Sequence, residues 1–217
     1  MKTITAINTE YNGYLFRSRI EARWAVFFDH VGLKYEYEKE GINLPFNGYY
    51  LPDFWLPELN IYIEVKGTYP TKIEKGKAQE LAIESGCLVA ILFGGIPSPD
   101  EDWWRDHFED YEGNYMLTFV DPSRYEYDEE SGCPFPEFTQ SFNSKNIGHT
   151  WGYNDSFMLC DCCGGISIDN TVYNGMKNEG CKKSTPPFFK YRLNIPYESF
   201  KVARMARFEH GETPVVR

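Results

Sequence analysis

Asp53, Glu64 and Lys66 have the types and the spacing of a metal-dependent hydrolytic site. Ten residues separate Asp53 from Glu64, and one residue separates Glu64 from Lys66. Because side chains alternate along a strand, Glu64 and Lys66 project from the same face. A tight hairpin turn over residues 56–59 would bring Asp53 opposite Glu64, where two carboxylates can share one cation.

Such a group of side chains suits the hydrolysis of phosphodiester bonds. Mg²⁺ prefers oxygen ligands and often uses one or two carboxylates together with substrate phosphate. A lysine beside the ion can orient or deprotonate water, or balance the charge that develops on phosphorus. The alternative is that Asp53, Glu64 and Lys66 form cross-strand ion pairs on a solvated face. The apolar neighbours of Glu64 and Lys66, and the Gly67 that follows them, favour the metal site.

The first part of the chain, to about residue 95, is predicted to be one α/β unit that positions these side chains. Residues 17–31 fit an amphipathic helix, and Gly32 follows as a stop signal. The runs predicted to be extended strands are 33–38, 49–55 and 60–66.

A second helix is predicted over residues 72–85. Thr71 can cap its N-terminus, Glu74 completes a capping box and Gly86 ends it. Residues 87–93 are almost purely apolar, which is typical of a strand buried on both faces. A strand, a helix and a strand with short joints imply a right-handed parallel crossover. The predicted fold class is therefore α/β, a mixed sheet flanked by helices.

The middle of the chain is strongly acidic. Residues 96–140 carry 13 acidic and 2 basic side chains, a local net charge of −11, whereas the whole chain carries −10. A nucleic-acid partner is not excluded, because electrostatic steering depends on local patches. The elements predicted here are a short exposed helix, a strand and a surface linker, over residues 100–110, 115–120 and 121–131.

The last part of the chain is predicted to be a smaller, irregular module. It lacks a clear period until residues 197–210, which fit a helix with one basic stripe of Lys201, Arg204 and Arg207. The predicted domains are the α/β unit, an acidic linker and a cysteine-containing accessory module that ends in the basic helix, over residues 1–120, 121–131 and 132–217.

Cysteines in this module have the spacing of a zinc-binding turn. Cys160 and Cys163 form a C-x-x-C pair followed by glycine, and Cys181 is a natural third ligand. Structural Zn²⁺ needs four ligands, and it would suit a module with few aliphatic residues. The alternative is a set of reduced cysteines packed in a small core. The candidates for the fourth ligand are Cys162, His149 and Cys133.

Composition excludes several classes of protein. The 217 residues are 42% hydrophobic and 17% aromatic, so a sizeable core is expected and wholesale disorder is excluded. No stretch approaches the ~18–20 apolar residues of a membrane helix, and the polar N-terminus lacks a secretion signal. We therefore expect a cytoplasmic protein with no membrane partner. Six cysteines are too few for a disulfide scaffold.

The order of these motifs resembles the PD-(D/E)XK nuclease superfamily. It is similar to the bacteriophage junction-resolving endonuclease I family and to the related transposon end-cleaving subunit. The likeness covers roughly residues 14–95 and does not extend to the cysteine cluster. The matching segments are Phe16–Glu21, Lys34–Glu38, Tyr50–Phe54 and Glu64–Gly67.

The resemblance implies a restriction-endonuclease-like fold and a DNA endonuclease that depends on Mg²⁺ or Mn²⁺. It also implies branched or structured DNA as substrate and a homodimer as the active unit. Asp53 and Glu64 would hold the metal, with the Val65 carbonyl as an extra ligand. Lys66 would assist the nucleophile.

In that family a glutamate on the first helix joins the site, and Glu21 occupies the matching position. It would support a second ion or the bound water. The alternative is that Glu21 satisfies backbone N–H groups in a capping box with Ser18. Glu21 nevertheless shares a helix side with Trp24 and Phe28, so it faces inward, where an unpaired carboxylate is costly.

Several residues near this predicted site are candidates for contact with DNA. Lysines at such spacing equally fit a solvated face, and the arginines of the first helix, including Arg23, have the same two interpretations. The candidates are Arg17, Arg19, Lys72, Lys75 and Gln79.

The rival hypothesis is a non-catalytic binding protein. The acidic segment could mimic nucleic acid and occupy a basic surface on a host or defence protein. It could also restrain a nuclease, because it would repel DNA at low salt. The complete set of Asp53, Glu64 and Lys66 argues against a nuclease fold that only binds DNA.

Overall fold

The structure is a computed structural model, and it describes six stretches of the chain. In these stretches no helix is long and apolar enough to cross a membrane. The predicted helix 100–110 and linker 121–131 lie outside them, as do His149 and all of the candidate zinc ligands except Cys160. The described residues are 6–97, 116–119, 157–160, 166–168, 193–194 and 196–208.

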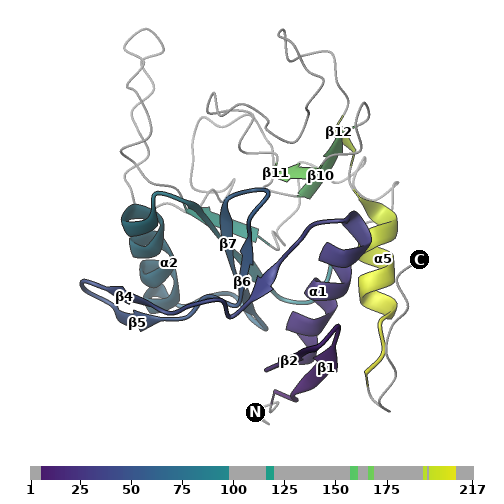
Figure 1. The fold of residues 1–217 in the computed structure, drawn as a ribbon, viewed down its shortest axis with the longest axis horizontal. Helices are drawn as coiled ribbons and strands as arrows, with labels where there is room; N and C mark the ends of the chain where they lie inside the picture. The colour runs from purple at the N-terminus through teal and green to yellow at the C-terminus, as the bar shows by residue number, and fades with distance from the viewer. Residues whose placement is uncertain are drawn as a thin grey trace, which may run out of the picture.

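A mixed five-stranded sheet forms the centre of the fold (Figure 1). Its strand order is β3-β6-β7-β8-β9, and only the neighbours β7 and β8 run parallel. Helices lie on both sides of the sheet, so the predicted mixed α/β class is confirmed. The strands are β3 Glu36–Tyr37, β6 Phe54–Leu56, β7 Ile61–Lys66, β8 Leu88–Phe93 and β9 Met116–Phe119.

Helix α2 (Lys72–Ser85) makes the parallel crossover from β7 to β8 and has the predicted ends. The Thr71 hydroxyl accepts the N–H of Glu74 at 3.3 Å, and the Glu74 carboxylate accepts the N–H of Thr71 at 2.7 Å. Gly86 ends the helix with a left-handed backbone, φ 61°, which costs glycine no Cβ clash. The helix packs on one face of the sheet through Ala78, Leu81 and Ala82, against Val89, Ile91 and Phe119.

Helix α1 (Arg19–Val31) packs on the other face with an aromatic core. It begins later than the predicted residue 17, because Ser18 is extended and caps the helix through its side chain. Trp24, Phe27 and Phe28 are at most 1% exposed and pack with Phe54 of β6 and with residues far along the chain.

Helix α5 (Tyr197–Met205) lies beside α1 (Figure 1). The rings of Phe27 and Phe200 stack with centroids 4.6 Å apart, and Arg23 Nε donates to the Ala206 carbonyl at 3.3 Å. The helix ends before Arg207, because Ala206 is extended. Lys201 and Arg204 lie in the helix as predicted, but the prediction that Arg207 continues the same helical stripe is wrong.

A small antiparallel sheet, ordered β11-β10-β12, contributes to the same core as α1 and α5. Phe157, Ile166 and Ile168 belong to that core. The described residues on either side of the predicted linker therefore share one hydrophobic core. The strands are β10 Phe157–Cys160, β11 Ile166–Ile168 and β12 Leu193–Asn194.

Two antiparallel hairpins complete the described fold. The predicted strand 49–55 is wrong, because its first residues pair with Ile42–Leu44 and its last residues pair with β7. Pro52, which cannot donate a ladder hydrogen bond, lies at the break. The predicted strand 33–38 pairs only at β3. The hairpin strands are β1 Thr9–Tyr11, β2 Tyr14–Phe16, β4 Ile42–Leu44 and β5 Gly48–Tyr50.

Candidate active site

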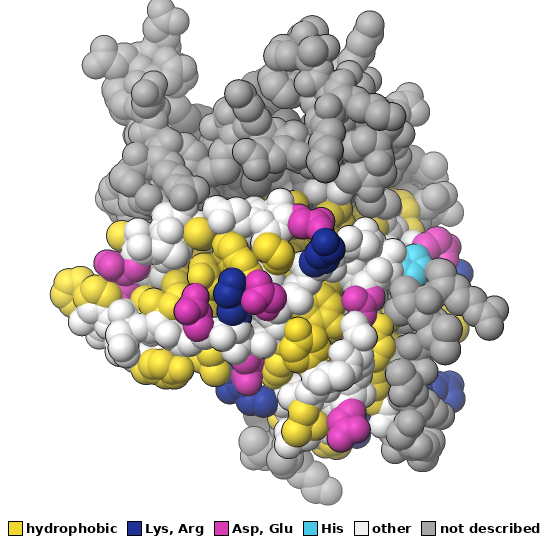
Figure 2. Space-filling view, viewed as in Figure 1, with side chains coloured by type: hydrophobic (Ala, Val, Ile, Leu, Met, Phe, Trp, Pro, Cys, Tyr) yellow, Lys and Arg dark blue, Asp and Glu magenta, His cyan; other side chains and the backbone are white. Residues whose placement is uncertain are grey.

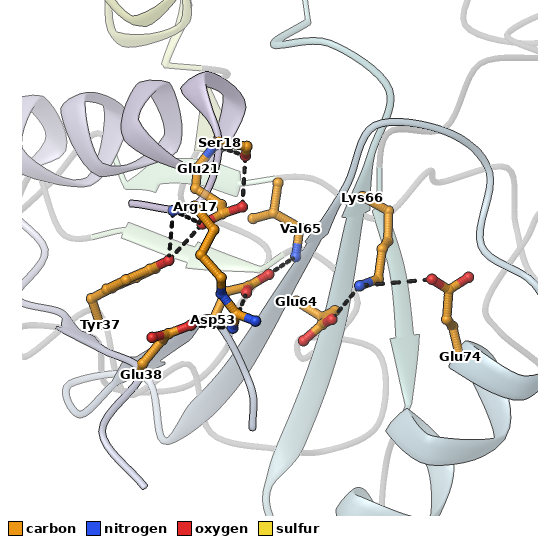
Figure 3. Close-up of polar contacts among 10 residues, drawn as sticks. All are labelled: Arg17, Ser18, Glu21, Tyr37, Glu38, Asp53, Glu64, Val65, Lys66 and Glu74. Carbon is orange, nitrogen blue, oxygen red and sulfur yellow. Dashed lines mark hydrogen bonds and ion pairs between the residues drawn. The ribbon is translucent and has the colours of Figure 1, made fainter. Parts of the chain in front are cut away.

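Asp53 immediately precedes β6 and lies beside Glu64 of β7, at the open end of the β6–β7 hairpin (Figure 3). The ladder pairs Phe54 with Ile63, so the next position outward sets Asp53 against Glu64, as predicted. The Val65 N–H donates to Asp53 Oδ2 at 2.7 Å and fixes that carboxylate. Asp53 and Glu64 are buried, at 5% and 6% exposure.

Alternation along β7 separates the charged side chains from the apolar ones. Ile61, Ile63 and Val65 belong to the core around α1. Glu64 and Lys66 project to the opposite face, where Lys66 Nζ forms an ion pair with Glu64 Oε1. Lys66 Nζ also lies 3.7 Å from Glu74 Oε1 at the start of α2.

The two carboxyl groups resist ionising together. Burial raises the pKa of Asp53 well above its usual range, and the charges of Glu64 and Glu21 raise it further. The Val65 N–H and Lys66 offset only part of this rise. Burial also raises the pKa of Glu64, although Lys66 lowers it in part. A cation held between the two groups would relieve this cost, because an opposite charge favours the ionised forms.

One oxygen of this pair is left without a partner. Glu64 Oε2 is buried and accepts no hydrogen bond within ordinary limits, although the nearby Tyr50 hydroxyl lowers the pKa of Glu64 somewhat. A buried carboxylate oxygen without a donor is costly. This oxygen is therefore the best-placed free lone pair for a ligand.

Lys66 is an ammonium group in this arrangement. Burial alone would lower the pKa of Lys66, but the charges of Glu64 and Asp53 raise it above its usual value. It can therefore donate hydrogen bonds and balance negative charge. While it is paired with Glu64 it cannot take a proton from water.

Glu21 faces inward as predicted, but it is not unpaired. Ser18 Oγ donates to Glu21 Oε1 at 2.6 Å, and Glu21 Oε2 accepts the Arg17 N–H at 3.0 Å and the Tyr37 hydroxyl at 2.6 Å. The alternative interpretation, in which Glu21 satisfies a backbone N–H and pairs with Ser18, therefore describes its hydrogen bonds. Among the residues that the structure describes, no three acidic, histidine or cysteine side chains are close enough to enclose an ion. The charge of Glu21 nevertheless acts on Asp53 and helps to raise its pKa.

Arg17 lies beside Asp53. Its Nη2 atom is 3.6 Å from Asp53 Oδ1 and forms an ion pair with Glu38, while 57% of the Arg17 side chain remains exposed. Glu38 has a left-handed backbone, φ 45°, and its N–H donates to the Asp53 carbonyl at 2.8 Å. Arg17 is therefore positioned beside Asp53 with a large part of its guanidinium side chain accessible.

The other predicted DNA contacts are distributed unevenly. Lys72 is exposed, and Lys75 is half-buried with Nζ 5.2 Å from the ring centre of Tyr69. Arg19 and Gln79 are half-buried. Arg23 donates to the carbonyl beyond α5, so its head group is directed away from the acidic pair. Acidic and basic side chains adjoin near the middle of this face, next to hydrophobic surface (Figure 2).

Four neighbours of the site were missed by sequence reasoning. Tyr37 and Glu38 hold Glu21 and Arg17, whereas Tyr50 and Glu74 lie near Glu64 and Lys66. The position of Glu74 near the site could have been predicted from the sequence. Its capping box marks the start of α2, and in a parallel crossover the helix starts near the end of the preceding strand, here β7.

No protein-family model matches the chain, and comparisons with curated proteins and with solved structures find no significant match. The functional argument therefore depends on the side chains of the site and their geometry.

Proposed function

We propose that the protein is a metal-dependent endonuclease that hydrolyses phosphodiester bonds in DNA, with branched or structured DNA as its preferred substrate. The supporting observation is the buried Asp53 and Glu64, next to each other across the hairpin, with a Glu64 oxygen that lacks a hydrogen-bond partner and Lys66 paired with Glu64. Ion pairs on a solvated face would not explain the burial of both carboxylates.

The residues present fit Mg²⁺ or Mn²⁺. Such ions are commonly held by one or two carboxylates, with substrate phosphate and water filling the other positions. Asp53 and Glu64 would supply these carboxylates. The N–H and C=O of a strand residue point to the same edge, so the Val65 carbonyl is directed toward the Asp53 side and is available as a third oxygen. When bound, the ion would polarise a phosphoryl oxygen and acidify a coordinated water.

The chain's own residues would then have distinct roles. The Val65 N–H orients Asp53, and Glu64 offers its free oxygen. Lys66, as an ammonium group, would stabilise the negative charge that develops on the phosphate. Arg17 would contact a phosphate oxygen, because its side chain is more than half exposed and is held by the ion pair with Glu38. Glu21 would act through Arg17 and Ser18 as a positioning residue.

The deciding experiment is cleavage of supercoiled, linear and four-way-junction DNA with Mg²⁺ or with EDTA. The parent should cut only with the metal, and Asp53→Ala and Lys66→Ala should lose cutting. Glu58→Ala is the matched control, since Glu58 is an exposed acid in the turn of the same hairpin. If Asp53→Ala and Lys66→Ala cut as fast as the parent, this site is wrong. A parent that cuts nothing would favour the binding-protein hypothesis.

Two finer features belong to the same proposal. The mixed sheet with its β7-α2-β8 crossover supports a restriction-endonuclease-like fold. The spacing of Cys160, Cys163 and Cys181 supports a structural Zn²⁺. Elemental analysis of the purified chain should give about one zinc per chain, and Cys163→Ser should lower that content.

A further inference from the structure

The β4–β5 hairpin presents an aromatic tip to solvent. Phe46 is 93% exposed and Tyr49 is 62% exposed. No charged residue occurs from Gly41 to Pro52. The hairpin extends past the foot of α2, on the side of the molecule away from α5 (Figure 1). An exposed aromatic at the end of an uncharged projection has no stabilising role in the described fold.

The tip is held in place by a buried carboxylate. Glu80 of α2 is 7% exposed and accepts hydrogen bonds from the Phe46 N–H at 2.6 Å, the Asn47 N–H at 3.0 Å and the Asn47 side-chain amide at 2.6 Å. Both carboxylate oxygens are used. Phe46 is therefore presented on a fixed backbone, which reduces the entropy lost on binding.

The other end of the hairpin is part of the candidate active site. Strand β5 ends at Tyr50, which is buried beside Glu64, and Asp53 follows three residues later. Phe46 lies in the turn, four residues before Tyr50, a separation that an extended chain spans in at most about 14 Å at ~3.4 Å per residue. The rise of DNA is also ~3.4 Å per nucleotide of one strand. DNA at the site would therefore pass the tip about four nucleotides from the reacting phosphate.

The surroundings of the hairpin favour nucleic acid over a protein partner. Lys77 Nζ lies 5.9 Å from the ring centre of Tyr50, and Lys75 Nζ lies 5.2 Å from that of Tyr69, which is 51% exposed. Two lysines of α2 thus lie against aromatic rings, of which Tyr69 is accessible and Tyr50 is buried. Lysines can neutralise phosphates, while aromatic rings stack on bases of any sequence.

We propose that Phe46 is a wedge that stacks against a base, or between two bases, of DNA bound at the Asp53–Glu64 site. The inference rests on the proposed endonuclease function and adds how the substrate is gripped. An apolar side chain inserted at a base step unstacks and bends the duplex. Such insertion is easiest where stacking is already broken, as at a branch point. The hairpin would therefore contribute to selection of structured DNA.

The test measures binding with cutting suppressed by EDTA. DNA carries 2-aminopurine, whose fluorescence rises on unstacking, at successive positions around the cleavage site. The parent should raise the fluorescence at one position about four nucleotides from the cut. Phe46→Ala should abolish that rise and weaken binding roughly 5- to 150-fold, as expected for loss of one base–aromatic stack. Phe46→Trp should keep both the fluorescence rise and the affinity of the parent.

Two controls separate this effect from unfolding and from general loss of apolar surface. Phe46→Ala should melt at the parent's temperature, because the side chain is 93% exposed. Met205→Ala removes an apolar side chain that is 70% exposed on α5, and it should change neither fluorescence nor affinity.

Each contrary result has its own meaning. Equal affinity and equal fluorescence for Phe46→Ala and the parent would overturn the wedge while leaving a cutting parent as a nuclease. Light scattering could show that the parent is a dimer and Phe46→Ala a monomer, while titration shows an unchanged DNA affinity per subunit. That result would overturn the wedge in favour of self-association through Phe46. A parent that neither binds nor cuts DNA would overturn the proposed function, and the wedge with it.

Discussion

The Asp53 carboxylate accepts a 2.7 Å hydrogen bond from the backbone N–H of Val65, the residue between Glu64 and Lys66. This bond joins the Asp53 side chain to the backbone of the neighbouring strand β7. It does so at Val65, and the two residues next to Val65 carry the charged side chains of that strand. The relation between the acids is therefore set by main-chain geometry. It does not depend on long, flexible side chains finding one another.

Asp53→Asn is expected to stabilise the protein and to inactivate it. The pKa of Asp53 is raised in the folded state, so its favourable contribution exists at acid pH and is lost as pH rises through the raised value. A neutral side chain removes that cost at pH 7. Cleavage should fall by at least ~10²-fold, because a catalytic metal contributes several kcal/mol.

Thermal melting in EDTA and cleavage in Mg²⁺ check this expectation together. Glu58→Gln, in the exposed turn of the same hairpin, is the control and should change neither. A melting temperature for Asp53→Asn at pH 7 below that of the parent would contradict the argument.

Metal affinity is expected to increase with pH. Burial raises the pKa values of Asp53 and Glu64, and a metal binds the deprotonated forms. Binding must therefore release protons, and affinity must fall as pH falls through the raised values. Calorimetric titration with Mn²⁺ in two buffers of different ionisation enthalpy measures the protons released. An affinity that does not fall on acidification from neutral pH would rule out these two carboxylates as the ligands.

Glu21 is expected to matter first for stability. Glu21→Ala leaves the Tyr37 hydroxyl without its acceptor and the Arg17 N–H with only the Tyr37 oxygen, at 3.1 Å. This should cost about 1–3 kcal/mol in the free energy of unfolding. Tyr37→Phe removes the hydrogen bond to Glu21 and the one accepted from the Arg17 N–H, and should cost about 1 kcal/mol for each. Denaturant unfolding measures both.

The isostere Glu21→Gln keeps an acceptor, so it should retain more cleavage activity than Asp53→Asn. Were Glu21→Gln to lose cleavage as completely as Asp53→Asn at an unchanged melting temperature, Glu21 would act directly on a metal or on water.

Because of Glu80, the stability of the fold is expected to fall as the pH is lowered in the acid range. Burial opposes ionisation, but the hydrogen bonds from Phe46 and Asn47 lower the pKa of Glu80 overall. Its stabilisation is thus complete above the usual glutamate pKa and is lost as pH falls through the lowered value. Glu80→Gln should melt below the parent at pH 7, and the difference should shrink on acidification.

Melting curves at a series of pH values give this comparison, with exposed Glu84→Gln on the same helix as control. Equal melting of Glu80→Gln and the parent at pH 7 would mean that these hydrogen bonds do not stabilise the hairpin tip.

Features that depend on neighbouring residues were predictable from the sequence. The limits of α2 follow from Thr71, Glu74 and Gly86, whose effects reach one helical turn. The facing of Asp53 and Glu64 follows from alternation and a short turn. Neither requires knowledge of distant parts of the chain.

The β4–β5 hairpin was missed although its turn contains Asn47-Gly48, a common hairpin signal. Aromatic residues on both sides of Pro52 suit extended structure, so the hydrophobic pattern alone continues across the change of partner that Pro52 marks. Only the assembled sheet shows that one run serves two hairpins.

The network around Arg17 could not be predicted, because it depends on assembly of the fold. Arg17 precedes α1, Glu38 follows β3 and Asp53 precedes β6, so the three meet only when helix and sheet are packed. Glu38 also needs a left-handed backbone, which glutamate seldom adopts.

The packing of α5 on α1 has a consequence for synthesis of the chain. Phe27 emerges from the ribosome long before its stacking partner Phe200, since α1 ends at Val31 and α5 begins at Tyr197. At ~5–20 residues translated per second, the delay is about 10–30 s. Throughout that interval the apolar side of α1 lacks part of its cover. Completion of the core that supports the Asp53–Glu64 site is thereby coupled to translation of residues 197–208.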